Sequence, residues 1–101
     1  PSSAASDVYK RQLDKLLFRI QSVKNAAENK YILLNAPDVA LPEIIKILPG
    51  MKSPTVLPLA EEGWSSIHSV IREDAFWDII DQLKALGAEG ILVTNVEKMI
   101  L

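Results

Sequence analysis

The sequence has no cysteine, only one histidine and four glycines, and no long apolar run. The absence of cysteine excludes a secreted module held together by disulfides, and it excludes a metal site with thiolate ligands. No apolar run approaches the ~20 residues that a bilayer-spanning helix needs, and residues 1–12 lack a signal-peptide core. A net charge of -2 argues against nucleic acid, which attracts strongly basic surfaces. We therefore expect a soluble, cytoplasmic protein with no nucleic-acid partner and no membrane partner.

The composition indicates one folded domain. Of the 101 residues, 49% are hydrophobic and 24% are charged, which excludes a disordered chain. The length allows one real hydrophobic core and is too short for two.

The N-terminal part divides into two segments. Residues 1–8 are small and polar without periodicity and resemble a cloning remnant, so we predict that residues 1–11 are a disordered or non-native lead-in. Apolar residues then recur at helical spacing, at Leu13, Leu16, Leu17, Ile20 and Val23. This pattern predicts a helix over roughly residues 8–28, and we assign residues 12–29 to it as a separate segment.

Residues 30–101 contain the signals of a mixed α/β domain. Short runs of strand-forming residues, each bounded by turn residues, predict four strands, at residues 31–34, 55–60, 64–72 and 90–94. Pro58 cannot donate a ladder hydrogen bond, so its strand should lie at a sheet edge or carry a bulge.

Two helices are predicted between these strands. Asp38 and Asp74 are expected to cap them, Pro42 fits a first helical turn, and Gly87 fits the left-handed end of the second helix. The resulting βαββαβ order predicts an α+β, ferredoxin-like fold behind an N-terminal helix. In that fold, two helices cover one face of a four-stranded antiparallel sheet, and the other face is free to meet a partner.

The chain offers little catalytic chemistry. His68 lies near Ser65, Ser66 and Asp74, but these residues are neighbours on one strand rather than groups that the fold brings to one point. The carboxylate pairs lack the spacing of a calcium loop, and the glycines form no phosphate-binding cluster. From the residues alone, we interpret the chain as a small binding or regulatory domain with no catalytic residue and no metal site.

Five segments together carry a family resemblance, at residues 31–37, 48–60, 77–88, 90–93 and 96–100. They resemble the C-terminal regulatory domain of long-form ATP phosphoribosyltransferase, the first enzyme of histidine biosynthesis. The resemblance extends from about residue 13 to the end of the sequence. Residues 49–60 and residues 97–100 are its most specific parts.

The resemblance implies a sensor separated from its enzyme. In that family, catalytic domains N-terminal to this region condense ATP with phosphoribosyl pyrophosphate and use Mg²⁺. This chain would then have no activity and no cofactor of its own, and residues 12–29 would be the connector helix from the catalytic domain. The family's regulatory domain is ferredoxin-like and similar to PII signal proteins, and its inhibitor histidine favours a closed hexamer.

The resemblance also implies a histidine site, formed by Asn35, Met51, Ser53, Thr55, Val70 and Gly90. Thr55 would hydrogen-bond polar ligand atoms, and Met51 and Val70 would supply apolar walls and backbone groups. Asn35 stands where relatives can have an acid that pairs with the imidazole; the amide accepts a hydrogen bond but forms no ion pair. Gly90 would offer its backbone from a neighbouring subunit.

Two other functions remain open at this stage. The chain could be an oligomerisation module that holds catalytic domains together through its open sheet face. It could also be a small stand-alone enzyme, which the single histidine and the lack of metal ligands disfavour. Stabilisation by free histidine would distinguish a sensor from an oligomerisation module.

Overall fold

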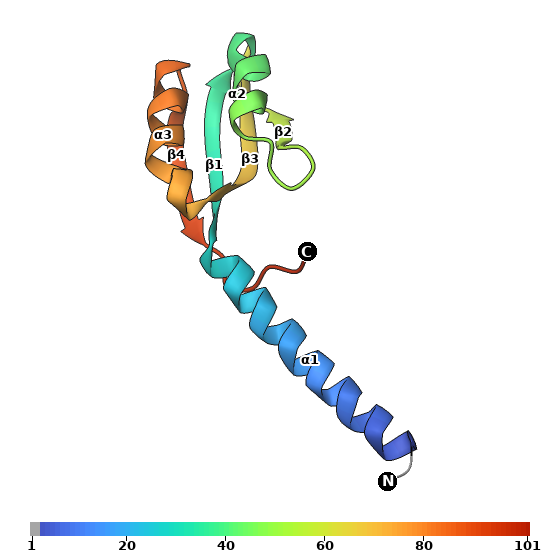
Figure 1. The fold of residues 1–101 in the computed structure, drawn as a ribbon. Coiled ribbons are helices and arrows are strands. Elements are labelled where there is room, and N and C mark those ends of the chain that lie inside the picture. Colours follow the sequence, from blue (N-terminus) through green and yellow to red (C-terminus); the bar gives the residue numbers. More distant parts are fainter. Residues whose placement is uncertain (1–2) are drawn as a thin grey trace.

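The computed structural model describes residues 3–101 (Figure 1). Its elements follow in the order α1 (Ser3–Ala27), β1 (Asn29–Pro37), α2 (Leu41–Ile47), β2 (Thr55–Pro58), β3 (Trp64–Arg72), α3 (Phe76–Ala85) and β4 (Glu89–Asn95). Short 3₁₀ turns, Asp38–Ala40 and Glu73–Ala75, precede α2 and α3. The predicted βαββαβ order after the first helix is confirmed.

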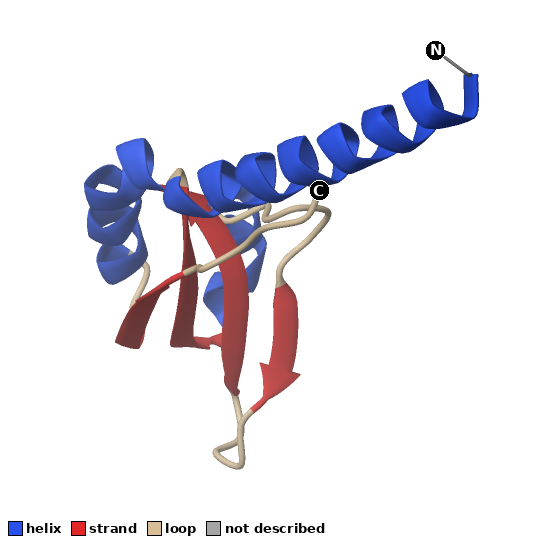
Figure 2. Cartoon of the chain, turned by 90° about the horizontal axis from the view of Figure 1, so that it is seen from below, coloured by secondary structure: helices blue, strands red, loops and turns tan. Residues whose placement is uncertain are grey.

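The four strands form one sheet in the order β2-β3-β1-β4, and every neighbouring pair is antiparallel. The two central strands pair along their whole length, from Asn29 opposite Arg72 to Pro37 opposite Trp64. Helices α2 and α3 pack on one face of this sheet, and α1 projects away from it as a long rod (Figures 1 and 2). The structure therefore has the predicted α+β, ferredoxin-like fold.

The core lies between the sheet and helices α2 and α3. Along β1 and β3, buried and half-buried residues alternate, as expected for strands with one covered face. The buried cluster comprises Ile32, Leu34, Ala36, Ala40, Ile44, Leu48, Ile67, Ile71 and Leu83. The alternate residues of the central strands lie on a face that no helix covers.

Two local predictions are confirmed. Pro58 lies in β2, an edge strand, so its missing N–H costs no ladder hydrogen bond. Gly87 ends α3 with φ +92°, and the Ala88 N–H reaches back to the Leu83 carbonyl at 3.0 Å.

The two predicted aspartate caps are wrong. Neither α2 nor α3 has a side-chain cap hydrogen bond, because a 3₁₀ turn stands where each cap was expected. The Asp38 carboxylate accepts a hydrogen bond from the Ser65 hydroxyl at 2.6 Å, and Asp74 is bound by Arg72. Both carboxylates therefore serve contacts to β3 rather than helix ends.

The N-terminal segment differs from the prediction. Helix α1 begins at Ser3, so residues 3–11 of the expected lead-in are helical, and residues 1–2 lie outside the described residues. Alanine, lysine, arginine and glutamine favour helix there, so the helix continues ahead of Leu13. The apolar stripe of α1 is exposed, with side chains from Leu13 to Ile20 that are 44% to 56% accessible. Within residues 3–101, no helix has both the length and the apolar character needed to cross a membrane.

Candidate functional site

The uncovered face of the sheet combines polar and apolar side chains. Antiparallel pairing sets directly opposed residues on the same face. One row across the sheet contains Thr55, His68, Leu33 and Leu92, and the next contains Leu57, Ser66 and Asn35. Three of the residues implied by the resemblance, Thr55, Asn35 and Val70, therefore share this face.

His68 lies at the centre of this face and is held on both sides of its ring. Its Nδ1 lies 3.1 Å from the Tyr31 hydroxyl, and its Nε2 lies 3.0 Å from the Ser66 hydroxyl. The Tyr31 ring meets the imidazole edge to face, with centroids 6.1 Å apart. Because Asp74 binds Arg72 instead, the side chains do not converge as a catalytic triad.

Asn35 and Gly90 lie together on neighbouring strands. A Cβ atom on Gly90, which has φ +57°, would lie 3.7 Å from Asn35 Nδ2. The β1–β4 register shifts between Leu33 and Asn35, which places Glu89 opposite Asn35. This irregularity brings the Gly90 backbone beside the Asn35 amide of the same chain, whereas the resemblance implied a Gly90 from a neighbouring subunit.

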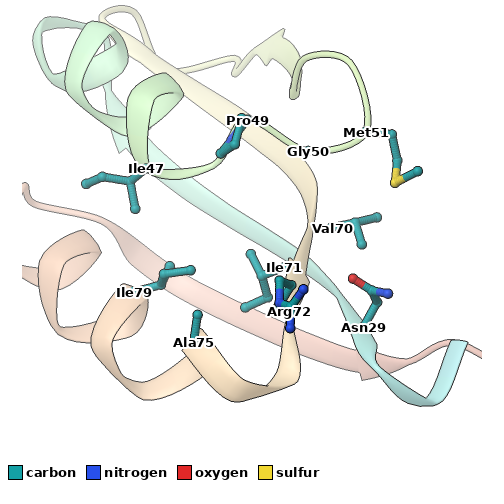
Figure 3. Close-up of a pocket in the computed structure, with 10 residues that line it drawn as sticks. All are labelled: Asn29, Ile47, Pro49, Gly50, Met51, Val70, Ile71, Arg72, Ala75 and Ile79. Atoms are coloured by element: carbon teal, nitrogen blue, oxygen red, sulfur yellow. The ribbon is translucent and has the colours of Figure 1, made fainter. Parts of the chain in front are cut away.

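Met51 and Val70 line a cavity of about 280 Å³ at the end of the sheet (Figure 3). The other lining residues are Asn29, Ile47, Pro49, Gly50, Ile71, Arg72, Ala75 and Ile79. Val70 and Ile71 are consecutive on β3 and point to opposite faces, so the cavity lies at the rim of the sheet. It is mostly apolar, and Asn29 and Arg72 supply its polar side chains.

A stretch of β3 that pairs with β1 but not with β2 forms one wall of this cavity. Strand β2 pairs with β3 only as far as Thr55 opposite His68, so β3 has no β2 partner from Ser69 to Arg72. The loop after α2 covers this stretch. The edge of a strand presents unpaired N–H and carbonyl groups, which suit the carboxylate and ammonium of an amino acid.

Gly50 lets this loop approach β3 closely. It has φ +63°, and a Cβ there would lie 2.9 Å from the Ser69 hydroxyl oxygen and 3.5 Å from the Ser53 carbonyl oxygen. Ser69 is buried and donates to the Leu48 carbonyl at 3.4 Å. The backbone carbonyl of Ser53 therefore lies beside Gly50 in this loop, and Ser53 itself is exposed.

The structure thus separates the six implied residues into groups. Asn35 and Gly90 are adjacent, Thr55 lies across β3 from them, Met51 and Val70 share the cavity, and Ser53 lies beside Gly50 in the loop. The sequence reasoning did not select Asn29 and Arg72, the polar side chains of the cavity. Both lie at strand ends whose pairing, Asn29 opposite Arg72, only the register reveals.

A surface ion pair lies at the cavity rim. The Arg72 guanidinium donates two hydrogen bonds to the Asp74 carboxylate, at 3.0 and 2.9 Å. Hydrogen bonding from Arg72 lowers the pKa of Asp74, and the same contact raises the pKa of Arg72. Both side chains are exposed, so this pair orients Arg72 and contributes little to stability.

The carboxylates of the described residues do not gather as metal ligands. Within residues 3–101, no group of three or more histidine, aspartate or glutamate side chains is placed to hold a metal ion. The described residues do form a rim cavity and an uncovered sheet face that carries both polar and apolar side chains.

Comparison with known protein families matches this chain to one of them. The profile described as "HisG, C-terminal domain" matches residues 26–98, which include every strand and both helices of the sheet layer. The chain belongs to this family. The resemblance drawn from residues 31–100 is therefore confirmed.

Individual relatives agree with the family match. The chain is 64% identical over 96 residues to an ATP phosphoribosyltransferase of Phocaeicola vulgatus, covering 95% of this chain and 34% of the relative. It is 59% identical over 96 residues to the enzyme of the same name from Bacteroides thetaiotaomicron, with the same coverage. The Cytophaga hutchinsonii relative is 59% identical over 88 residues, which is 87% of this chain and 31% of that protein. The chain spans about a third of the length of the curated relatives it matches.

Proposed function

We propose that this chain is the histidine-sensing regulatory domain of an ATP phosphoribosyltransferase. Membership in the HisG C-terminal family carries the proposal. The rim cavity supports it, because Met51 and Val70 lie there beside an unpaired strand edge. A cavity of about 280 Å³ suits a single amino acid better than a nucleotide.

The ligand would bind between two copies of the chain. A histidine zwitterion needs acceptors for its ammonium, donors for its carboxylate and a polar partner for its ring. Within one chain, Asn35 and Gly90 lie on β1 and β4, and Met51 and Val70 line the rim cavity. If one copy contributes the cavity and its neighbour contributes Asn35 and Gly90, a single ligand can contact both groups.

The rest of the proposal concerns the longer protein. The catalytic domains would lie in the two thirds of the relatives that this chain does not span, and Mg²⁺ would serve those domains alone. The full enzyme would be a cytoplasmic homo-oligomer, a hexamer, in which bound histidine lowers activity. The chain by itself would turn over no ATP or phosphoribosyl pyrophosphate.

Thermal unfolding with added amino acid tests the sensor function. At a histidine concentration ~100 times the dissociation constant, binding adds about 2.7 kcal/mol to stability. Each kcal/mol is worth ~4–8 °C for a domain of this size, so the midpoint should rise by roughly 10 °C or more. Equal concentrations of leucine should give no rise. A shift that is the same for both amino acids would contradict the proposal.

Thr55→Ala is the diagnostic variant, and Thr94→Ala is its matched control. Both threonines are exposed on strands of the sheet, but only Thr55 belongs to the proposed site. Loss of the Thr55 hydroxyl should weaken histidine binding by ~1–3 kcal/mol, measured by calorimetry. Thr94→Ala should bind histidine as the unchanged chain does, and equal losses in both variants would remove Thr55 from the site.

Mixing two variants tests whether the site spans copies. Asn35→Ala and Met51→Ala would each impair every site in a homo-oligomer. In a mixed oligomer, some sites would combine an intact Asn35 from one copy with an intact Met51 from its neighbour. Histidine binding should therefore recover partly in the mixture, whereas a site within one chain would show no recovery.

An oligomerisation module remains the second candidate, because the uncovered sheet face exposes apolar side chains. Leu57 on β2 is 51% accessible and Leu92 on β4 is 62% accessible. Contact between copies through this face would bury both. Self-association without any response to histidine would favour this function over the sensor.

A further inference from the structure

Helix α1 has few contacts that fix its direction. From Ser3 to Gln21 every residue of the helix is exposed, and the buried ones are Ser22 and Ala26, near its C-terminal end. Its apolar stripe therefore does not anchor it to the sheet. Whatever sets the angle of α1 must act on its last two turns.

The chain after β4 supplies two of these contacts. It runs back along α1 (Figures 1 and 2), and the Met99 N–H donates to the Ser22 carbonyl at 2.9 Å. The Asn25 side chain donates from Nδ2 to the Met99 carbonyl at 3.2 Å. Both backbone polar groups of Met99 are thus used on α1, although 74 positions separate Met99 from Asn25.

Asn29 supplies a third contact from the first residue of β1. Its side-chain amide donates to the Asn25 carbonyl at 2.8 Å, across the junction between helix and strand. Asn29 also lines the rim cavity with Met51 and Val70 (Figure 3). One side chain therefore contacts both the helix end and the cavity.

We propose that Asn25, Asn29 and the Met99 backbone form a lock that holds α1 at one angle to the sheet, and that an occupant of the rim cavity acts on this lock through Asn29. The second half rests on the proposed function, because it takes the cavity to receive the amino acid. An occupant with a carboxylate would compete with the Asn25 carbonyl for the Asn29 amide donor. Its binding would free the helix end and redirect α1.

The absence of cysteine makes the angle of α1 measurable by spin labels. Lys15→Cys on α1 and Lys84→Cys on α3 place two nitroxides on exposed helical positions. Pulsed electron resonance then reports the distance distribution between the two helices. The chain with its lock intact should give one narrow distribution.

Two independent changes open the lock. Asn25→Asp removes the amide donor to Met99 and keeps an oxygen for Gln21, whose side chain donates to Asn25 at 2.7 Å. Deletion of residues 99–101 removes the Met99 backbone itself. Each lost hydrogen bond should multiply the released population about 2- to 12-fold, with loss of the single narrow peak. Gln12→Ala, at an exposed position of α1, is the control that should leave the distribution unchanged.

The outcomes separate the lock from the proposed function. If Asn25→Asp and the deletion both leave the distribution as narrow as in the control, with helix content preserved by circular dichroism, the lock is overturned. Addition of L-histidine should shift the distribution in the labelled chain and leave Asn29→Ala unshifted. An equal shift in Asn29→Ala overturns the coupling through Asn29. If histidine neither shifts the distance nor raises the melting temperature, the sensor function fails, while a response to the two lock variants still supports the lock.

Discussion

Replacing Gly50 by alanine should destabilise the fold more than the same replacement at Gly63. Both glycines have positive φ, +63° and +84°, so a new Cβ costs ~1–2 kcal/mol of backbone strain at either position. The smaller unfolded-state entropy of alanine offsets both changes by a similar amount, about 0.4–1 kcal/mol. The difference between the two variants therefore reports their surroundings.

The surroundings differ sharply. A Cβ on Gly63 would meet nothing within 4 Å, whereas a Cβ on Gly50 would lie 2.9 Å from Ser69 Oγ. Ser69 would have to rotate and give up its hydrogen bond to the Leu48 carbonyl, in a buried position. A buried polar group left without a partner costs ~1–3 kcal/mol. Gly50→Ala should therefore lower the free energy of unfolding by ~1–3 kcal/mol more than Gly63→Ala does. This difference corresponds to ~4–24 °C in melting temperature.

Urea unfolding followed by tryptophan fluorescence measures both variants, and a double-mutant cycle with Ser69→Ala identifies the cause. Without the Ser69 hydroxyl, the cost of Gly50→Ala should fall to that of Gly63→Ala. If the two single variants are equally stable, the loop does not approach β3 as closely as described. The rim cavity, which this loop lines, would then have a different shape from the one described.

Three further predictions concern the core, the ion pair and the long helix. Ile44→Ala should cost ~2–5 kcal/mol in chemical unfolding because Ile44 is fully buried, whereas Ile45→Ala, at a site 41% exposed, should cost much less; equal costs would contradict the assigned face of α2. Arg72 lowers the pKa of Asp74 below its ordinary value of 3.8. The small stabilisation from this ion pair is therefore fully present above pH 3.8, and it is lost as the pH falls through the lowered pKa. In Arg72→Gln, an NMR titration should find the Asp74 pKa back near that value, and an unchanged titration would remove Arg72 as the cause. Leu16→Lys should reduce self-association in sedimentation without lowering the melting temperature, because Leu16 is 53% exposed, and a large loss of stability would show that α1 is packed.

The fold was predictable from the sequence where local chemistry and burial agree. The sequence predicts a strand over residues 64–72, and the structure has one strand over the same span, along which buried and half-buried residues alternate. Pro58 pointed to an edge strand because proline cannot donate in a ladder. The helix caps were not predictable, because the carboxylates of Asp38 and Asp74 have better partners on β3 that only the tertiary fold supplies.

The resemblance implied a set of site residues, but their arrangement was not predictable from the sequence. The resemblance supplied Asn35, Met51 and Thr55, but no local pattern shows which strand face each one shares. Asn29 and Arg72 become neighbours only through the β1–β3 register, which depends on pairing between residues far apart in sequence. No local pattern marks Asn29 as a site residue, although its amide contacts α1 and the residue lines the cavity.

The two groups of proposed ligand residues differ in how directly they can reach α1. Asn35 and Asn29 are six positions apart on β1, which corresponds to roughly 20 Å along a strand. A ligand group at Asn35 is therefore remote from the helix end, whereas one at Met51 lies in the cavity that Asn29 lines. Under the proposed function, the Asn35 side of the site contributes affinity and selectivity, while the cavity side transmits occupancy to α1. Binding and signalling then depend on different residues of one small sheet, and variants at Asn35 and Met51 should separate the two.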